Sequence, residues 1–220
     1  MDPLPEVSFN YWIEIGIAIC AVFGAFLYKF ITKFEFKDKK FLTDVWSVHG
    51  NIHECLTELR VLTDAARVQV IQFHNGEYFM DGVSMKKMSC THESLSKGVS
   101  SQADKINGLL ISLFAPFIED VTKNSPVPYL LKNQKDSFGK HAFEAANVHC
   151  YCVLPIRHKN AICGYLMTQW CNPHKAKAVF SDPEKYVNEV TNARNEIEVY
   201  LEEQSRSKWK ILKKQKQSNR

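Results

Sequence analysis

The chain has 220 residues, a formal net charge of +4 and 45% hydrophobic residues, which is enough for one sizeable domain with extensions. Its seven cysteines form no C-x-x-C pair, and an odd number cannot all pair within one chain. The pattern indicates free thiols and argues against an exported, disulfide-rich domain.

The N-terminal part of the chain carries a long apolar run. Residues 1–10 form a short acidic segment, and residues 11–32 are then almost wholly apolar. About 20 apolar residues are enough to cross a bilayer, so we expect one transmembrane helix over 11–32, with a buried core helix as the alternative. Lysines follow the run and acidic residues precede it. The positive-inside rule therefore predicts a single-pass protein of the inner membrane, with the N-terminus outside and the C-terminal domain cytoplasmic.

Residues 33–64 are expected to form a basic juxtamembrane segment and then an amphipathic helix. Apolar or small side chains recur every three or four residues from Leu42 to Thr63, with His49, Ile52, Leu56 and Leu59 between them. This spacing predicts either a parallel coiled-coil pair, and hence a homo-oligomer, or one helix packed on its own domain.

Residues 65–204 alternate between strand and helix patterns. Arg67–Phe73 is β-branched and alternating, and we expect His74-Asn75-Gly76 to end this strand before Met85–Thr91 returns antiparallel to it. The elements expected next are a helix over Ser101–Lys123, a short strand over Val127–Leu131 and a short helix within Asp136–Asn147.

A β-hairpin and a helix complete this part of the chain. Cys150–Arg157 and Ile162–Trp170 are rich in strand-forming residues, and the turn between them contains Asn160, which tolerates a positive φ. Gly164 leaves room for a helix or ligand beside the second strand. The pattern Ser181-Asp182-Pro183-Glu184 predicts a capping box that begins the last helix.

The order of these elements, with the hairpin VLPIRHKNAICGYLMTQW at Val153–Trp170, resembles a GAF domain. The resemblance implies an α+β fold in which an antiparallel sheet is sandwiched by helices, with a cavity between the sheet and a helical insertion. The segment Phe73–Glu93 also resembles small phage- and prophage-encoded GAF-like membrane proteins. The NKFDE-type motif of cyclic-nucleotide-binding members and the cysteine context of bilin attachment are both absent, so the ligand and cofactor stay unknown.

Polar and aromatic residues follow the first strand, where the sheet would meet the mouth of that cavity. They are the predicted ligand-binding residues: His74, Asn75, Glu77, Tyr78 and Phe79. Asn-Gly is equally the signature of a plain turn. The leading hypothesis is a non-catalytic, membrane-anchored, cytoplasm-facing GAF-like module that binds a small molecule or a partner and forms a homo-oligomeric scaffold.

The basic tail over 205–220 supports a second hypothesis. It has no acidic residue after Arg206, and its candidate contacts with anionic lipid or nucleic acid are Lys208, Trp209, Lys210, Lys213 and Lys214. A viral or phage protein that tethers nucleic acid to a membrane would use such a tail.

Catalytic and metal-binding alternatives rest on cysteine and histidine. Cys90 and His92, with Glu93 beside them, are the candidates for a Cys/His enzyme. Residues two apart on a strand lie about 6–7 Å apart, which is beyond hydrogen-bond reach. The possible metal ligands are grouped as His149, Cys150 and Cys152; Cys171 and His174; His49 and His53. None of these groups alone supplies the four ligands of a structural zinc site, so no metal is predicted.

Overall fold

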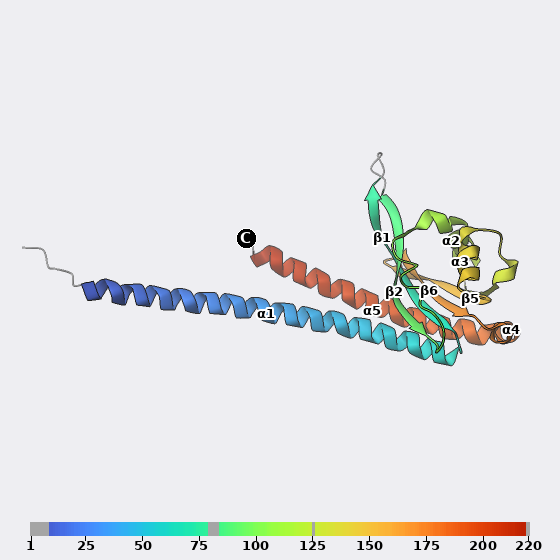
Figure 1. The fold of residues 1–220 in the computed structure, drawn as a ribbon, viewed down its shortest axis with the longest axis horizontal. Coiled ribbons are helices and arrows are strands. Elements are labelled where there is room, and N and C mark those ends of the chain that lie inside the picture. Colours follow the sequence, from blue (N-terminus) through green and yellow to red (C-terminus); the bar gives the residue numbers. More distant parts are fainter. Residues whose placement is uncertain (1–8, 79–83, 125, 219–220) are drawn as a thin grey trace, which may run out of the picture. The chain divides into compact units, whose positions relative to one another are not determined.

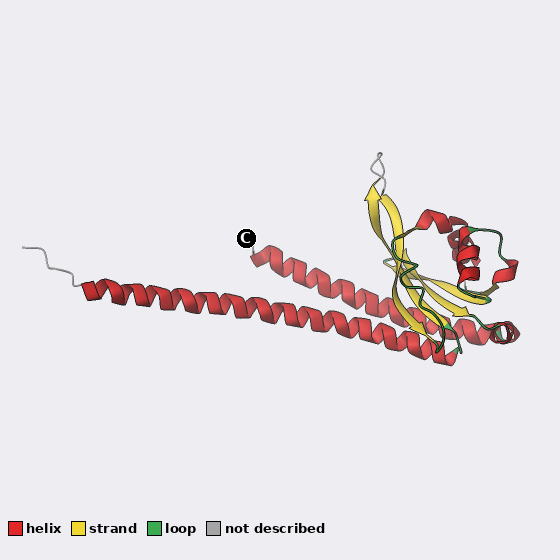
Figure 2. Cartoon of the chain, in the orientation of Figure 1, coloured by secondary structure: helices red, strands yellow, loops and turns green. Residues whose placement is uncertain are grey.

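The computed structural model describes residues 9–78, 84–124 and 126–218, and the side chains of 17–29, 46–75, 86–123 and 126–204. The chain divides into two compact units, Met1–Trp46 and Ser47–Arg220. The second unit contains a six-stranded sheet with the order β3-β2-β1-β6-β5-β4, in which every neighbouring pair is antiparallel. Helices cover both faces of this sheet (Figures 1 and 2), as the resemblance implied.

The predicted C-terminal hairpin is confirmed as β5 (Cys150–His158) and β6 (Ala161–Trp170). Lys159 and Asn160 form its two-residue turn with φ values of 50° and 67°, which is the backbone twist that joins antiparallel strands tightly. Pro155 causes no loss of ladder bonding, because the edge strand β4 (Pro128–Leu130) pairs with β5 only as far as Cys152.

The N-terminal hairpin is longer than predicted. β1 runs over Arg67–Tyr78 and β2 over Ser84–Leu95, so His74-Asn75-Gly76 does not end the first strand. Cross-strand pairing overrides the local turn signal here. Gly164 also has a different use from the predicted one: a Cβ at this position would lie 2.2 Å from the Ile71 carbonyl oxygen. The close neighbour is therefore the backbone of β1.

One face of the sheet packs against the C-terminal part of α1 (Phe9–Leu62) and against α5 (Pro183–Ser218). Ile52, Leu56 and Leu59 of α1 share a core with Val190 and Ile197 of α5, and all five are at most 2% exposed. These positions of the predicted seam are thus buried within the chain's own domain. The structure supports an amphipathic helix packed on its own domain over a coiled-coil pair through these residues.

The other face packs against the insertion between β2 and β5. The predicted helix over Ser101–Lys123 is wrong in its first half, where the chain forms a loop, β3 (Leu109–Leu110) and the 3-10 helix η1 (Ile111–Phe114). Only α2 (Ala115–Asn124) is α-helical, because Pro116 is tolerated in a first turn. The 3-10 helix η2 (Leu131–Asn133) and α3 (Phe138–Ala145) complete this layer.

The start of the last helix lies one residue later than the capping box predicts. An unpredicted helix, α4 (Pro173–Ser181), uses Ser181 as its last residue, and the Ser181 hydroxyl donates to the Ala178 carbonyl oxygen (2.7 Å). Asp182 then caps α5, because its Oδ1 accepts from the Lys185 backbone N–H (3.4 Å). An aspartate and a serine are equivalent caps in a sequence pattern, so only the structure decides between them.

The predicted transmembrane helix over 11–32 is wrong, and the predicted single-pass location in the inner membrane is wrong with it. No helix in the described ranges is long and apolar enough to cross a membrane. Glu14 and Lys29 leave only the 14 residues Ile15–Tyr28 without a charge. That is about 21 Å of helix at ~1.5 Å per residue, against about 30 Å of hydrocarbon.

Candidate functional site

The predicted ligand-binding residues lie on the outer part of the β1–β2 hairpin. His74 and Asn75 are exposed and bond to β2: His74 Nε2 lies 2.9 Å from Ser89 Oγ, and Lys86 Nζ donates to Asn75 Oδ1 (2.7 Å). The side chains of Glu77 and Tyr78 lie outside the described set, and Phe79 lies outside the described residues altogether. Ligand binding by this group stays a prediction.

The tail residues Lys208, Trp209, Lys210, Lys213 and Lys214 belong to the helical backbone of α5. Their side chains lie outside the described set. Lipid or nucleic-acid binding by the tail therefore also stays a prediction.

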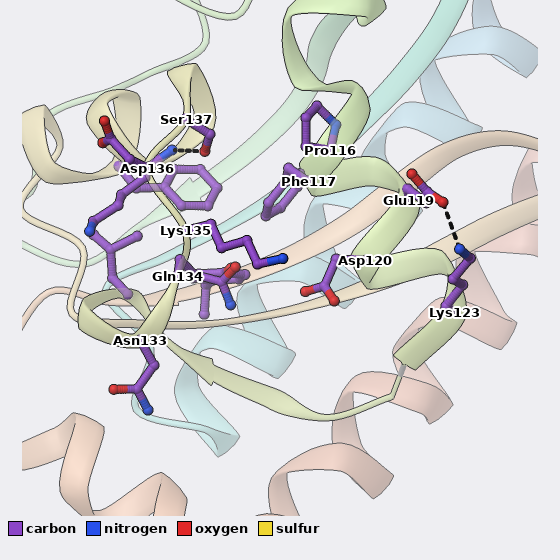
Figure 3. A pocket seen from close by; sticks show the side chains of 14 residues that line it. Pro116, Phe117, Glu119, Asp120, Lys123, Asn133, Gln134, Lys135, Asp136 and Ser137 are labelled. Carbon is purple, nitrogen blue, oxygen red and sulfur yellow. Dashed lines mark hydrogen bonds and ion pairs between the residues drawn. The ribbon is translucent and has the colours of Figure 1, made fainter.

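A cleft of about 530 Å³ opens on the insertion side of the sheet, between α2 and the segment that joins η2 to α3 (Figure 3). Small-molecule sites typically measure about 300–1,000 Å³. α2 contributes one wall through Pro116, Phe117 and Asp120, and Asn133–Lys140 contributes the other wall. Ser137 positions this second wall, because its hydroxyl oxygen caps α3 by accepting from the Lys140 backbone N–H (3.2 Å).

Aromatic rings form the floor of the cleft. Phe117 and Phe143 meet edge to face with centroids 5.4 Å apart, and both contact Tyr151 of β5 at 5.6 Å and 4.9 Å. Tyr129, which does not itself line the cleft, stacks on the Tyr151 ring with centroids 5.4 Å apart and planes 11° apart. Such a floor suits a flat ring, which stacks on aromatic faces or edges.

The Tyr151 hydroxyl is a buried polar group of a residue that lines the cleft. Tyr151 lines the cleft but is fully buried, and its Oη has no hydrogen-bond partner in the described part of the chain. Burial, followed by the proximity of Tyr129 and Asp120, raises the pKa of Tyr151 far above its ordinary value. The phenol therefore stays protonated and presents an O–H donor, which a buried tyrosine normally satisfies.

Charged side chains line the walls above this floor. Glu119 pairs with Lys123 (2.6 Å) and Asp136 pairs with His141 Nε2 (3.0 Å). Lys135 and Lys140 have no ion pair among the described side chains, and Figure 3 shows Lys135 extending across the cleft toward Asp120. The walls above the aromatic floor thus carry both lysines and carboxylates.

The cavity that the resemblance implied between the sheet and the insertion is nearly closed. It measures about 50 Å³, and apolar side chains of the sheet and of α2 and α3 line most of it. Phe117 and Phe143 line both this cavity and the open cleft. These two rings therefore separate the cleft from the interior.

The predicted Cys/His pair does not form a nucleophile and base. His92 lies opposite Val70, whereas Cys90 lies opposite Ile71, and adjacent strand residues face opposite sides of the sheet. Burial, followed by Glu93, raises the pKa of Cys90 to about 12, which disfavours the reactive thiolate. The described residues contain no group of three His, Cys, Asp or Glu side chains arranged to hold a metal ion.

The cleft residues were not predicted as a site, because the sequence around each of them is typical of a buried core segment or of a loop. Phe117, Lys135 and Tyr151 belong to three separate elements. One local signal is present: Ser137 is a residue type preferred at a helix N-cap, and it lies at the start of the stretch where a short helix is expected.

No protein-family model and no curated protein sequence matches the chain. Among solved structures, the red-light-absorbing state of NpR6012g4, a red/green cyanobacteriochrome, aligns with a TM-score of 0.51 at 12% identity, over 70% of this chain and 93% of that one. A far-red-absorbing dark state with bound biliverdin IXa gives 0.50 at 14% identity, over 76% and 98%.

A third similar structure is GAF3 of Slr1393 from Synechocystis sp. PCC6803 in its photoproduct state, with a TM-score of 0.50 at 11% identity, over 74% and 98% of the two chains. Identities this low show the fold alone. The chain thus has a GAF-like α+β fold, as its hairpin predicted, and the predicted likeness to phage-encoded proteins finds no support among these structures.

Proposed function

We propose that this chain is a non-catalytic small-molecule-binding domain of GAF-like fold, and that its ligand occupies the cleft between α2 and α3. The observation that carries the proposal is Tyr151, a residue of the cleft lining whose buried hydroxyl has no hydrogen-bond partner in the described part of the chain. A ligand with an acceptor atom would satisfy this donor, and Lys140, which has no ion pair among the described side chains, favours an anionic group. The expected ligand is therefore a planar aromatic molecule that carries an anionic or acceptor substituent.

The residues of the cleft favour a ligand held without a covalent bond. One of the similar structures holds biliverdin IXa. The described lining of this cleft contains no cysteine, so a thioether link of the kind that holds many chromophores has no candidate here. Noncovalent stacking on Phe117 and Tyr151 is the mode that the lining supports.

The test uses 1-anilinonaphthalene-8-sulfonate, an aromatic anion, titrated into the full chain while amide NMR signals are recorded. We expect saturable shifts of the amides of α2 and α3. Phe117→Ala should weaken binding at least about tenfold, because the removed ring is a large part of the stacking surface. The control is Phe180→Ala, which removes an exposed phenylalanine from α4. Equal affinities of the two variants, or shifts confined to other segments, would contradict the proposal.

Self-association is a second candidate function, and one observation favours it. Residues 17–29 of α1 are exposed all around the helix, including Val22 at 72% and Phe26 at 68%. A helix that is apolar on every side is normally buried against other apolar surfaces. The same helix of a second copy of this chain would provide such a surface.

Sedimentation of the full chain tests self-association. Val22→Glu should shift the chain from oligomer to monomer, because it places a charge in the apolar surface. Val199→Glu, at an exposed valine of α5 (54%), is the control and should leave the oligomer intact. A wild-type chain that stays monomeric at high micromolar concentration excludes this function.

A further inference from the structure

Three histidines meet where α1 packs against β2. His49 Nδ1 lies 2.7 Å from His92 Nε2, and the two rings stack with centroids 4.9 Å apart. His53, one helical turn after His49, contacts the same His92 ring edge to face at 5.3 Å. Two elements distant in sequence thus bring three imidazoles into direct contact.

His92 is the buried member of this group. It is 3% exposed, and its second ring nitrogen, Nδ1, lies 3.0 Å from Thr91 Oγ1. Burial, followed by the proximity of His49 and His53, lowers the pKa of His92 from 6.5 to about 4. His92 is therefore neutral at pH 7, and both of its nitrogens already have partners.

The surroundings of the group come from three elements. On α1, the titratable groups that face His92 are His49 and His53. On β2, Thr91 is uncharged, whereas Glu93 and Cys90 lie on the opposite face of the sheet, since they pair with Gln69 and Ile71 rather than with Val70. On α5, the Gln204 amide nitrogen lies 3.3 Å from His49 Nε2. His49 thus joins α1 to both β2 and α5.

We propose that His49, His53 and His92 form a proton-responsive junction, which holds α1 to β2 and α5 while the rings are neutral and loosens on acidification. The bond between His49 Nδ1 and His92 Nε2 requires one of these nitrogens to be unprotonated. When both carry a proton, two N–H donors face each other and the hydrogen bond is lost. The positive charges then repel one another in a partly desolvated contact.

The direction of the pH dependence follows from the pKa of His92. A folded pKa of about 4 lies below the ordinary value of 6.5, so the unfolded chain binds the proton more readily. The stabilising contribution is complete above pH 6.5 and is lost as the pH falls toward 4. This one group should raise the unfolding equilibrium constant about 30-fold between pH 8 and pH 5.

Urea unfolding of the full chain at pH 8 and pH 5 tests the junction. The acid-induced rise in the unfolding constant should be about 30-fold larger in the wild type than in His92→Gln, which cannot take up a proton. His141→Gln is the control, because His141 is exposed and pairs with Asp136 on the other side of the sheet; its response should equal that of the wild type. The same response in all three chains would overturn the proposal.

A ring titration in the unmutated chain provides a readout that needs no substitution. Among the eight histidines, one ring signal should titrate near pH 4 and should move together with backbone amides around His49 and Gln204. If every ring of the folded chain titrates at pH 6 or above, the junction is refuted. If His92→Gln does not fold, His49→Gln removes one of the two imidazoles beside His92 and leaves His92 buried, so its acid-induced rise should be smaller than that of the wild type but should not vanish; a rise equal to that of the wild type would contradict the junction.

Discussion

At the scale of single residues, removing the Tyr151 hydroxyl should change stability and ligand affinity in opposite directions. A buried donor without a partner costs about 1–3 kcal/mol in desolvation. Tyr151→Phe removes that group and keeps the ring, so the ligand-free chain should become more stable by up to this amount. Affinity for the aromatic anion should fall about 2- to 10-fold, since a hydrogen bond contributes about 0.5–1.5 kcal/mol. Urea unfolding measures the stability, and the titration followed by amide NMR signals measures the affinity.

Tyr129 supplies the matched control for this substitution. Its hydroxyl is also buried without a partner in the described part of the chain, and burial raises its pKa to about 12, but it does not line the cleft. Tyr129→Phe should therefore stabilise the chain and leave binding unchanged. A loss of stability in Tyr151→Phe would mean that the hydroxyl already has a hydrogen-bond partner. The main argument for a ligand in the cleft would then fail.

At the scale of elements, Gly164 determines how closely β6 approaches β1. A Cβ would lie 2.2 Å from the Ile71 carbonyl oxygen and 3.1 Å from the Gln72 Cα, and both are backbone atoms that move only with their strand. Gly164→Ala should therefore destabilise the chain by about 1–3 kcal/mol or more, the usual cost of overpacking. Urea unfolding measures the change.

Gly50 gives the opposite expectation for the same substitution. It lies inside α1, and a Cβ there would meet nothing within 4 Å. Gly50→Ala should stabilise the chain by about 0.5–1 kcal/mol, because glycine is a poor helix residue. Equal effects at the two positions would show that glycine itself, rather than the β1–β6 contact, decides the outcome.

Local patterns predicted the elements whose pairing is local. The β5–β6 hairpin follows from turn residues next to its strands, and α5 begins within one residue of the start that the predicted capping box gives it. The strand β1 continues through Asn75-Gly76 because β2 pairs with it as far as Tyr78. The Asn-Gly turn signal depends on two neighbouring residues only, so it cannot show that a partner strand pairs across them.

At the scale of the whole molecule, neither the cleft nor the histidine group was predictable from one stretch of sequence. Phe117 and Tyr151 are separated by 34 positions, and they meet because the insertion folds back onto β5. His49 and His92 are 43 positions apart. The sequence therefore predicted the sheet and its helical layers, whereas the sites depend on tertiary contacts. The apolar run near the N-terminus predicted a membrane span with Glu14 and Lys29 at its headgroup ends, whereas these two charges leave only the 14 residues Ile15–Tyr28 between them.

The three cysteines of the helix-side core have a practical consequence. Cys55, Cys150 and Cys152 share one apolar cluster with α5, and burial above all raises the pKa of each to about 12. Alkylating reagents consume thiolates, so these three react only when the helices of that layer separate from the sheet. Their alkylation rate, followed by mass spectrometry, therefore measures how often these helices separate from the sheet.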